Sequence, residues 1–372
     1  MKLVYTPEKM KEDEYKIAVF RQKQSLPYDA KVRHAEIRAR EFYDATDGQC
    51  HVSVGGLDSI TLLIFLRSIG IRVPAVSVSV LEDKSIQAVH KALGVIPLKP
   101  AKSKVAVIQE YGYPILSKET ANKIALLQNP TPKNVTVRHA IITGETGEYG
   151  GYRKNTRMKM SEKWLKKFGG ADEEGMQKGY AAAPFRVSDK CCYYLKEKPC
   201  DDYAREHNSS PYLGLMASEH GRREKVLMTT GCNYFGKTVT RSAPFATFYR
   251  QDLLQLALDI NVPVPEIYGE IVRDPDGTLR TTGAQRTGCA MCGFGIHLEK
   301  RPHRFDALYR RNPDEWRFWM YRMGWGDVLD YIDVEWRHQN EEVPAGTATS
   351  DEHTNNTCEP ILSGREDEVN DC

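Results

Sequence analysis

Two pairs of cysteines, Cys191–Cys192 and Cys289–Cys292, are the residues whose types and spacing point most directly to chemistry. The first pair is adjacent in sequence, and the second is a Cys-x-x-Cys turn with a glycine on each side. Four thiolates from distant parts of a chain can bind one tetrahedral metal ion or one iron–sulfur cluster. These residues alone favour neither zinc nor an iron–sulfur cluster, because both accept four thiolates.

A glycine turn is the second feature that indicates a site. Residues 53–59 read SVGGLDS, between an expected strand and an expected helix. Such a turn places free backbone N–H groups at the positive end of a helix, which suits a phosphate group. Ser59 adds a hydroxyl, and Asp58 is placed either to cap the helix or to position a magnesium ion through water. We interpret the turn as a phosphate site, with a plain tight turn as the alternative.

The surrounding segments predict a parallel sheet with helices on both faces. Apolar periodicity, glycine stops and β-branched runs define the elements near the turn. The expected helices cover 30–46, 59–69, 85–93 and 249–259, and the expected strands cover 50–54 and 73–80. Strand, turn, helix and strand in this order are typical of an α/β protein. Four tryptophans near the end are expected to anchor a core: Trp316, Trp319, Trp325 and Trp336.

Charge is unevenly distributed along the 372 residues. Residues 338–372 hold nine acidic residues and one basic residue, a net charge of −8. Because the whole chain has a net charge of +2, residues 1–337 carry a net charge of +10. The acidic segment is polar and is predicted to be disordered, whereas a basic body fits a phosphate-bearing partner. The basic stretch 152–168 is interpreted as a solvated helix face, with a phosphate or nucleic-acid contact as the alternative.

The chain has neither an apolar run long enough for a membrane span nor an apolar N-terminal leader. We therefore expect a cytoplasmic protein without a membrane partner, in which nine cysteines serve metal binding, catalysis or burial rather than disulfides. The expected organisation is an N-terminal extension over 1–29, one nucleotide-binding α/β domain with a cysteine site over 30–337, and an acidic tail over 338–372.

The glycine turn resembles the Ser-Gly-Gly-x-Asp-Ser pyrophosphate loop of the adenine-nucleotide α-hydrolase superfamily, which includes ATP pyrophosphatases and sulfonucleotide reductases. Further segments narrow the resemblance to the PAPS reductase family, in its phage and bacterial branch, over roughly residues 30–335. The matching segments are 112–119 (GYPILSKE), 191–196 (CCYYLK), 214–219 (GLMASE) with Arg223, 231–233 (GCN), 267–269 (IYG) and 286–292 (RTGCAMC), which runs on to His297, Pro302, Arg304 and Phe305.

The resemblance implies a Rossmann-like sheet of the HUP type and a [4Fe–4S] cluster. The cluster would be held by Cys191, Cys192, Cys289 and Cys292, as in the similar assimilatory adenylyl-sulfate reductases. Cys232 lies in a matching segment and is a rival to Cys192 as the fourth ligand. The choice between these two cysteines stays open at the level of sequence.

The resemblance also implies an adenine nucleotide, either ATP or one of the sulfonucleotides PAPS and APS, with Mg²⁺ as a further candidate. The expected nucleotide-binding residues are Ser53, Gly55, Gly56, Asp58, Ser59, Glu219, Arg223 and Arg241. Asp58 and Arg223 are the expected catalytic residues.

Several departures from the family pattern bear on the reaction. Val54 stands where the loop has its first serine, Leu57 stands where this branch has lysine, and residues 78–82 lack an expected aspartate. The Glu-Cys-Gly-x-His segment that carries the nucleophile of sulfonucleotide reductases is absent from the sequence. Cys358 and Cys372 have acidic neighbours, which disfavour a thiolate.

Three functional hypotheses follow. The first is a sulfonucleotide-reductase-like enzyme that uses a separate electron or sulfur donor protein. The second is an ATP pyrophosphatase that activates DNA or tRNA for sulfur insertion. The third is a non-catalytic nucleotide-binding or nucleic-acid-binding protein with a structural metal, which the changes at Val54, Leu57 and Val78 favour.

Overall fold

The computed structural model describes residues 7–147, 154, 156–219, 221–237, 239–289 and 291–338, without the side chains of residues 7 and 221–223. The acidic segment beyond residue 338 lies outside the described residues, as do positions 152, 153 and 155 of the basic stretch. The predicted disorder of the tail therefore stays a prediction. Among the described residues, no helix combines the length and the apolar character needed to cross a membrane.

A six-stranded sheet in the order β3-β2-β1-β5-β7-β6 forms the centre of the fold. All neighbouring strands run parallel except β6 and β7. The strands are β1 (Cys50–Ser53), β2 (Ala75–Ser77), β3 (Ile96–Pro97), β5 (Ser210–Leu213), β6 (Asn233–Phe235) and β7 (Thr240–Ser242). The predicted mixed α/β fold with a mostly parallel sheet is confirmed at this level.

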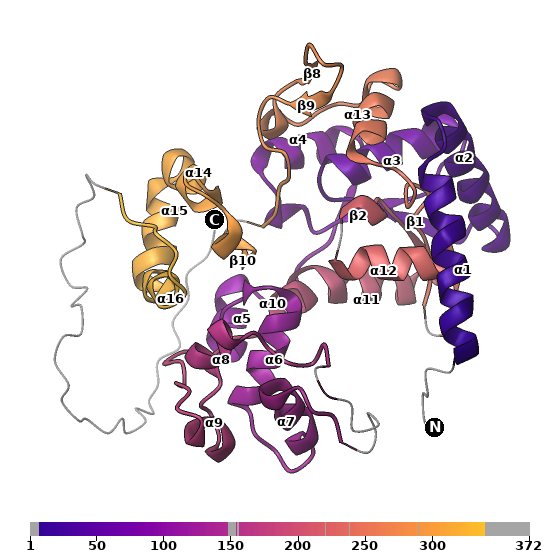
Figure 1. Cartoon of the computed structure of the whole chain (residues 1–372). Coiled ribbons are helices and arrows are strands. Elements are labelled where there is room, and N and C mark those ends of the chain that lie inside the picture. The colour runs from indigo at the N-terminus through magenta and orange to yellow at the C-terminus, as the bar shows by residue number, and fades with distance from the viewer. Residues whose placement is uncertain are drawn as a thin grey trace.

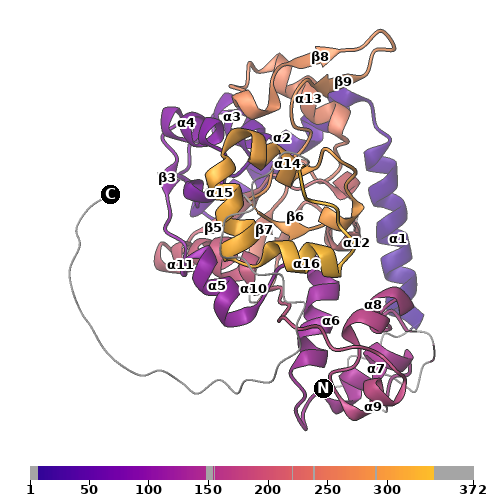
Figure 2. The ribbon, with the colours of Figure 1, turned by 90° about the vertical axis from the view of Figure 1, so that its left-hand side faces the viewer.

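Helices cover both sides of the sheet (Figures 1 and 2). The helices around it are α1 (Pro7–Gln24), α2 (Tyr28–Ala45), α3 (Leu57–Ser68), α4 (Lys84–Ala92), α11 (Lys198–Glu206), α12 (Gly221–Thr230) and α13 (Arg250–Asp259). Helices α2, α3 and α13 bury their apolar faces in one core with the strands, where Phe42, Ile60 and Leu253 are fully enclosed. On the other side of the sheet α12 packs against α1.

A second core lies beside the sheet and joins two segments that are distant in sequence. The elements that form or border it are α5 (Lys104–Tyr111), β4 (Ile115–Leu116), α6 (Lys118–Gln128), α7 (Val135–Thr143), α8 (Glu162–Phe168), α9 (Glu173–Gln177), β10 (Gly293–Phe294), η6 (Ile296–Leu298), α14 (Arg304–Arg311), α15 (Pro313–Arg317), η7 (Phe318–Arg322) and α16 (Trp325–Tyr331). Strands β4 and β10 pair in parallel and tie the segments together. All four tryptophans predicted to be core anchors are buried there, which confirms that prediction.

The remaining elements are short segments between these helices and strands. They are η1 (Ser79–Leu81), α10 (Lys190–Cys192), the π-helical η3 (Tyr193–Glu197), η4 (Ala217–Glu219), η5 (Glu266–Tyr268), β8 (Ile271–Arg273) and β9 (Leu279–Thr281). The elements α10, η3 and α11 follow one another directly. A π-helical turn inside a longer helix is frequently found at a functional site.

Two sequence-based boundaries need correction. The expected strand over 73–80 is limited to Ala75–Ser77, because the chain turns at Ser79–Leu81 and leaves Val80 65% exposed. The expected N-terminal extension contains α1, whose Phe20 is buried against Ala217 and Leu227. This part of the extension therefore belongs to the folded body.

Candidate functional site

The glycine loop leaves β1 and enters α3, and its hydrogen bonds explain its shape. The Gly55 N–H donates to the Ser59 hydroxyl oxygen at 2.7 Å, and that hydroxyl donates to the Gly56 carbonyl at 3.0 Å. The Leu57 N–H donates to the Tyr268 hydroxyl at 3.1 Å. Within the described part of the chain, no hydrogen bond uses the N–H of Gly56 or Asp58. These two donors at the start of α3 remain for a ligand.

The loop lies where the order of the strands reverses. From β1 the chain proceeds outward through β2 and β3 on one side and later returns to β5 on the other. Ligands of open α/β sheets bind at the carboxyl ends of the strands at such a point. Gly214, directly after β5, passes so close to the loop that a Cβ there would lie 2.9 Å from the main-chain nitrogen of Ser59. Glycine at this position thus permits the two strand ends to meet.

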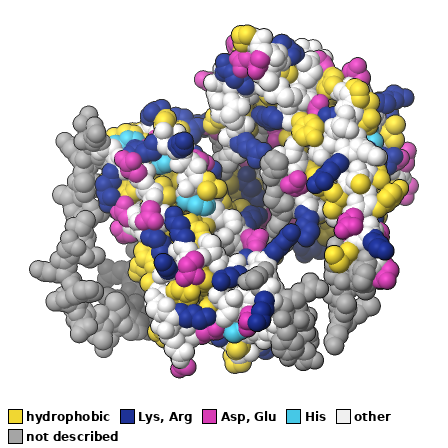
Figure 3. All heavy atoms as spheres, viewed as in Figure 1, with side chains coloured by type: hydrophobic (Ala, Val, Ile, Leu, Met, Phe, Trp, Pro, Cys, Tyr) yellow, Lys and Arg dark blue, Asp and Glu magenta, His cyan; other side chains and the backbone are white. Residues whose placement is uncertain are grey.

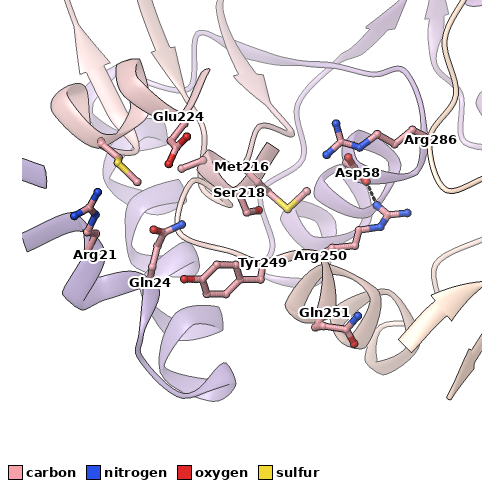
Figure 4. A pocket seen from close by; sticks show the side chains of 12 residues that line it. Arg21, Gln24, Asp58, Met216, Ser218, Glu224, Tyr249, Arg250, Gln251 and Arg286 are labelled. Carbon is pink, nitrogen blue, oxygen red and sulfur yellow. Dashed lines mark hydrogen bonds and ion pairs between the residues drawn. The ribbon is translucent and has the colours of Figure 1, made fainter. Parts of the chain in front are cut away.

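A pocket of about 720 Å³ opens beside the loop (Figure 4). Its walls come from α1, α3, α12, α13 and the segments after β5 and β9. The lining residues are Arg21, Gln24, Asp58, Met216, Ala217, Ser218, Glu224, Met228, Tyr249, Arg250, Gln251 and Arg286. Three arginines from three separate segments therefore face one cavity at the strand ends. Figure 3 shows Lys and Arg side chains gathered near the middle of the molecular face seen in Figure 1.

Asp58 is the only residue of the predicted set whose side chain lines this pocket among the described residues. It forms an ion pair with Arg250, and both side chains are less than a third exposed. Burial raises the pKa of the Asp58 carboxyl, Arg250 opposes that rise, and Glu219 adds to it. Because Arg250 already compensates Asp58, the pocket offers Arg21 and Arg286 to an anion.

The other predicted nucleotide residues have different positions. Ser53 ends β1 inside the sheet, and the hydroxyl of Ser59 is used within the loop. Glu219 accepts a long hydrogen bond from the Met216 N–H at 3.5 Å. Arg241 lies over the ring of Tyr234 in the β6–β7 hairpin and does not line the pocket. The side chain of Arg223, in α12, lies outside the described residues.

The structure also supplies residues that the sequence did not single out. Arg250 opens the predicted helix over 249–259, and Arg286 opens the quoted segment RTGCAMC, so both lay within recognised patterns. No sequence pattern indicated Arg21 or Gln24, because these residues reach the pocket only through the packing of α1 against α12.

Four of the five candidate metal ligands gather between the two cores. Cys191 and Cys192 lie in α10, and Cys289 and Cys292 form the tight turn before β10, with the Cys292 N–H donating to the Cys289 carbonyl at 3.1 Å. Burial raises the pKa of the Cys191 thiol to about 12, and the other three thiols add to the rise. Burial also raises the pKa of Cys192 to about 11.

Cys232 lies elsewhere, next to β6, buried with Phe20, Leu227 and Met228. The geometry therefore separates the rival ligand from the other four cysteines. In the ranges that the structure describes, no three His, Cys, Asp or Glu side chains are arranged as a ready-made metal site. The four gathered thiols are free cysteines.

Three lysines lie near the four gathered thiols. Their contacts indicate whether this environment suits neutral thiols or negatively charged thiolates. The Lys104 ammonium is buried over the ring of Trp319 and has no hydrogen-bond partner in the described residues. Lys118 lies near Cys192 and Lys196 lies near Cys289, but each lysine already forms an ion pair with a carboxylate, Glu197 and Glu82 respectively. Neutral thiols leave a buried ammonium uncompensated, which is unfavourable. Four thiolates that hold a metal or cluster would supply the negative charge that the Lys104 ammonium lacks.

Two sets of contacts join the cysteine site to the glycine loop. The Tyr268 hydroxyl, which accepts from Leu57, also hydrogen-bonds Thr287 at 2.6 Å, two residues before Cys289. On the other side Lys196 donates to Glu82 at 2.6 Å, and a Cβ at Gly55 would lie 3.7 Å from that carboxylate. A ligand on the loop and a group on the cysteines would consequently share neighbours.

No family model, no curated protein and no solved structure matches the chain.

Proposed function

We propose that this protein is an adenine-nucleotide-dependent enzyme of sulfur chemistry, similar to the sulfonucleotide reductases of the PAPS reductase family, on a HUP-type Rossmann-like sheet. One observation carries the proposal: the glycine loop at the strand ends contacts the segment that bears Cys289 through Tyr268 and Thr287. A glycine loop suited to phosphate, placed beside four gathered thiols, supports nucleotide chemistry coupled to sulfur.

One group of residues would bind the nucleotide, and a second group would bind the cluster. The amides of Gly56 and Asp58 and the guanidinium groups of Arg21 and Arg286 would bind the phosphate and sulfate oxygens of the nucleotide. Arg250 holds Asp58 in an ion pair, which keeps that carboxylate from repelling the anion. The pocket also surrounds the nucleotide with the apolar side chains of Met216 and Met228.

Cys191, Cys192, Cys289 and Cys292 would hold the [4Fe–4S] cluster, with the buried Lys104 ammonium balancing part of its charge. When bound, such a cluster supplies a fixed charge distribution next to the nucleotide, tuned by the hydrogen bonds to its sulfurs. The buried thiols must lose their protons on binding, so loading of the site should be favoured as pH rises.

The reaction supported best is reduction of a sulfonucleotide by an external thiol donor. Two thiols of the donor become a disulfide, the bond between sulfate and phosphate breaks, and sulfite and the nucleoside phosphate leave. The chain's part is to bind the nucleotide and orient its sulfate group. The ion pair of Asp58 with Arg250 favours this reaction over ATP cleavage, because it occupies the carboxylate that would otherwise help to place magnesium.

The test uses the full chain purified without oxygen. Binding of APS, PAPS and ATP is measured by calorimetry, and sulfite release is measured with dithiothreitol as the thiol donor. We expect a sulfonucleotide to bind and to yield sulfite, and Arg286→Gln to weaken that binding. Arg280→Gln is the matched control, because Arg280 pairs with Asp274 at the exposed β8–β9 hairpin. Pyrophosphate release from ATP without sulfite release would show that the enzyme cleaves ATP and does not reduce a sulfonucleotide. If no nucleotide binds, both reactions are refuted.

A further inference from the structure

A second cavity of about 430 Å³ lies between α1, α2 and the β6 edge of the sheet. None of its lining residues lines the pocket beside the glycine loop. Its polar residues are Lys23, His34, Arg38, Glu41, Thr230, Cys232, Asn233 and Thr247. Phe20, also on its wall, belongs to the apolar contact between α1 and α12. The cavity is therefore independent of the nucleotide and cysteine sites.

Three residues on the walls of this cavity carry buried polar atoms without partners in the described part of the chain. The Thr247 hydroxyl is unpartnered among the described residues, and its residue is only 1% exposed. Both ring nitrogens of His34 and the Nε of Arg38 are likewise buried without a partner. Buried polar groups are normally hydrogen-bonded, and each exception needs an explanation. Several such exceptions around one cavity indicate that a ligand completes them.

The charged residues of the cavity indicate the charge of the ligand that it suits. Lys23 and Arg38 contribute two cations, and Glu41 is already paired with Arg38. Burial, together with Lys23 and Arg38, lowers the pKa of His34 to about 4, so its ring is neutral at pH 7 and offers one N–H. A net positive cavity with unused N–H and O–H donors suits an anion that accepts several hydrogen bonds.

We propose that this cavity is a binding site for a phosphate- or sulfate-type oxyanion, held by Lys23, Arg38, His34 and Thr247. The oxyanion is either free or part of a mononucleotide, and both present the same tetrahedral oxygens. The proposal does not depend on the reaction at the glycine loop, because the two cavities share no residue.

Thr247→Val gives the sharpest test. Valine has nearly the shape of threonine, so the variant removes an unpartnered hydroxyl and should leave the ligand-free protein at least as stable as the wild type. Affinity for inorganic phosphate, measured by calorimetry at constant ionic strength, should fall about tenfold with loss of one hydrogen bond to a charged group. Thr230→Val is the matched control, because that hydroxyl on the same wall already donates to the Val226 carbonyl at 2.8 Å.

Lys23→Gln should weaken phosphate binding as well, whereas Arg280→Gln, at the exposed β8–β9 hairpin and in neither pocket, should not. If phosphate and AMP bind with equal affinity, the ligand of the cavity is a free oxyanion. If AMP binds more tightly than phosphate and Thr247→Val removes this difference, the ligand is the phosphate of a nucleotide. In the wild-type protein, phosphate should also slow alkylation of Cys232 without affecting Cys200. Phosphate binding that survives both Thr247→Val and Lys23→Gln, or no protection of Cys232, would overturn the proposal.

Discussion

Gly56→Ala should disrupt the contact between the glycine loop and the cysteine segment. Gly56 has φ −78° and ψ −164°, which any residue can adopt, so the effect is steric. A Cβ at this position would lie 2.3 Å from the Tyr268 hydroxyl and 3.0 Å from the Thr287 hydroxyl. Tyr268 must then withdraw from both Leu57 and Thr287. Two lost hydrogen bonds cost about 2 kcal/mol, and crowding adds about 1–3 kcal/mol, so the free energy of unfolding should fall by roughly 3–5 kcal/mol.

A double-mutant cycle measured by urea unfolding tests this reasoning. Tyr268→Phe alone should cost about 1–3 kcal/mol, because it leaves the Leu57 N–H without its acceptor. In the double variant the clashing hydroxyl is gone, and the nearest ring carbon would lie at an ordinary 3.5 Å from the new Cβ. The double variant should therefore be less destabilised than the sum of the single changes, by about 1–3 kcal/mol.

Gly55→Ala is the matched control in the neighbouring position. A Cβ at Gly55 would meet nothing closer than 3.7 Å, so its effect on stability should stay within about 0.5 kcal/mol. Additive effects of Gly56→Ala and Tyr268→Phe, or an equal loss of stability in Gly55→Ala, would refute the packing on which the proposed coupling rests.

Three further changes probe charges at the two sites. Lys104→Met removes a buried ammonium without a hydrogen-bond partner, so it should raise the urea midpoint of the metal-free protein and weaken iron retention; a lower midpoint would argue against this role. Arg286→Gln should weaken sulfonucleotide binding about tenfold or more in calorimetry, and unchanged affinity would remove Arg286 from the site. Burial raises the pKa of Asp58, so its contribution to stability is present below the ordinary value of 3.8 and is lost as pH rises through the raised value. Asp58→Asn should flatten this part of the stability profile in unfolding experiments across pH, and an unaltered slope would contradict the burial of that charge.

The sequence predicted the elements that are specified locally. The strand, glycine turn and helix around 50–69 depend on a short apolar run, two glycines and a mainly apolar helical segment, and all three are present. The second strand was predicted too long, because β-branched residues favour a strand wherever they stand, whereas Val80 projects into solvent after the turn at Ser79. Element types were thus easier to predict than their ends.

The walls of the pocket depend on contacts between distant segments, which local patterns do not encode. Arg21 reaches the pocket because Phe20, on the same helix, is buried against α12. The cysteines show the same limit. Spacing predicted that two pairs could meet, but the separation of Cys232 follows from its place beside the antiparallel β6 at the sheet edge. That place is fixed only by the order of the strands.

The central claim is that Cys191, Cys192, Cys289 and Cys292 hold one iron–sulfur cluster beside the nucleotide loop. Iron, acid-labile sulfide and zinc in protein purified without oxygen test it most directly, in the wild type, Cys192→Ser and Cys232→Ser. The account predicts about four irons and four sulfides per chain in the wild type and in Cys232→Ser, with loss of both in Cys192→Ser. Stoichiometric zinc without sulfide, or loss of iron in Cys232→Ser with retention in Cys192→Ser, would contradict it.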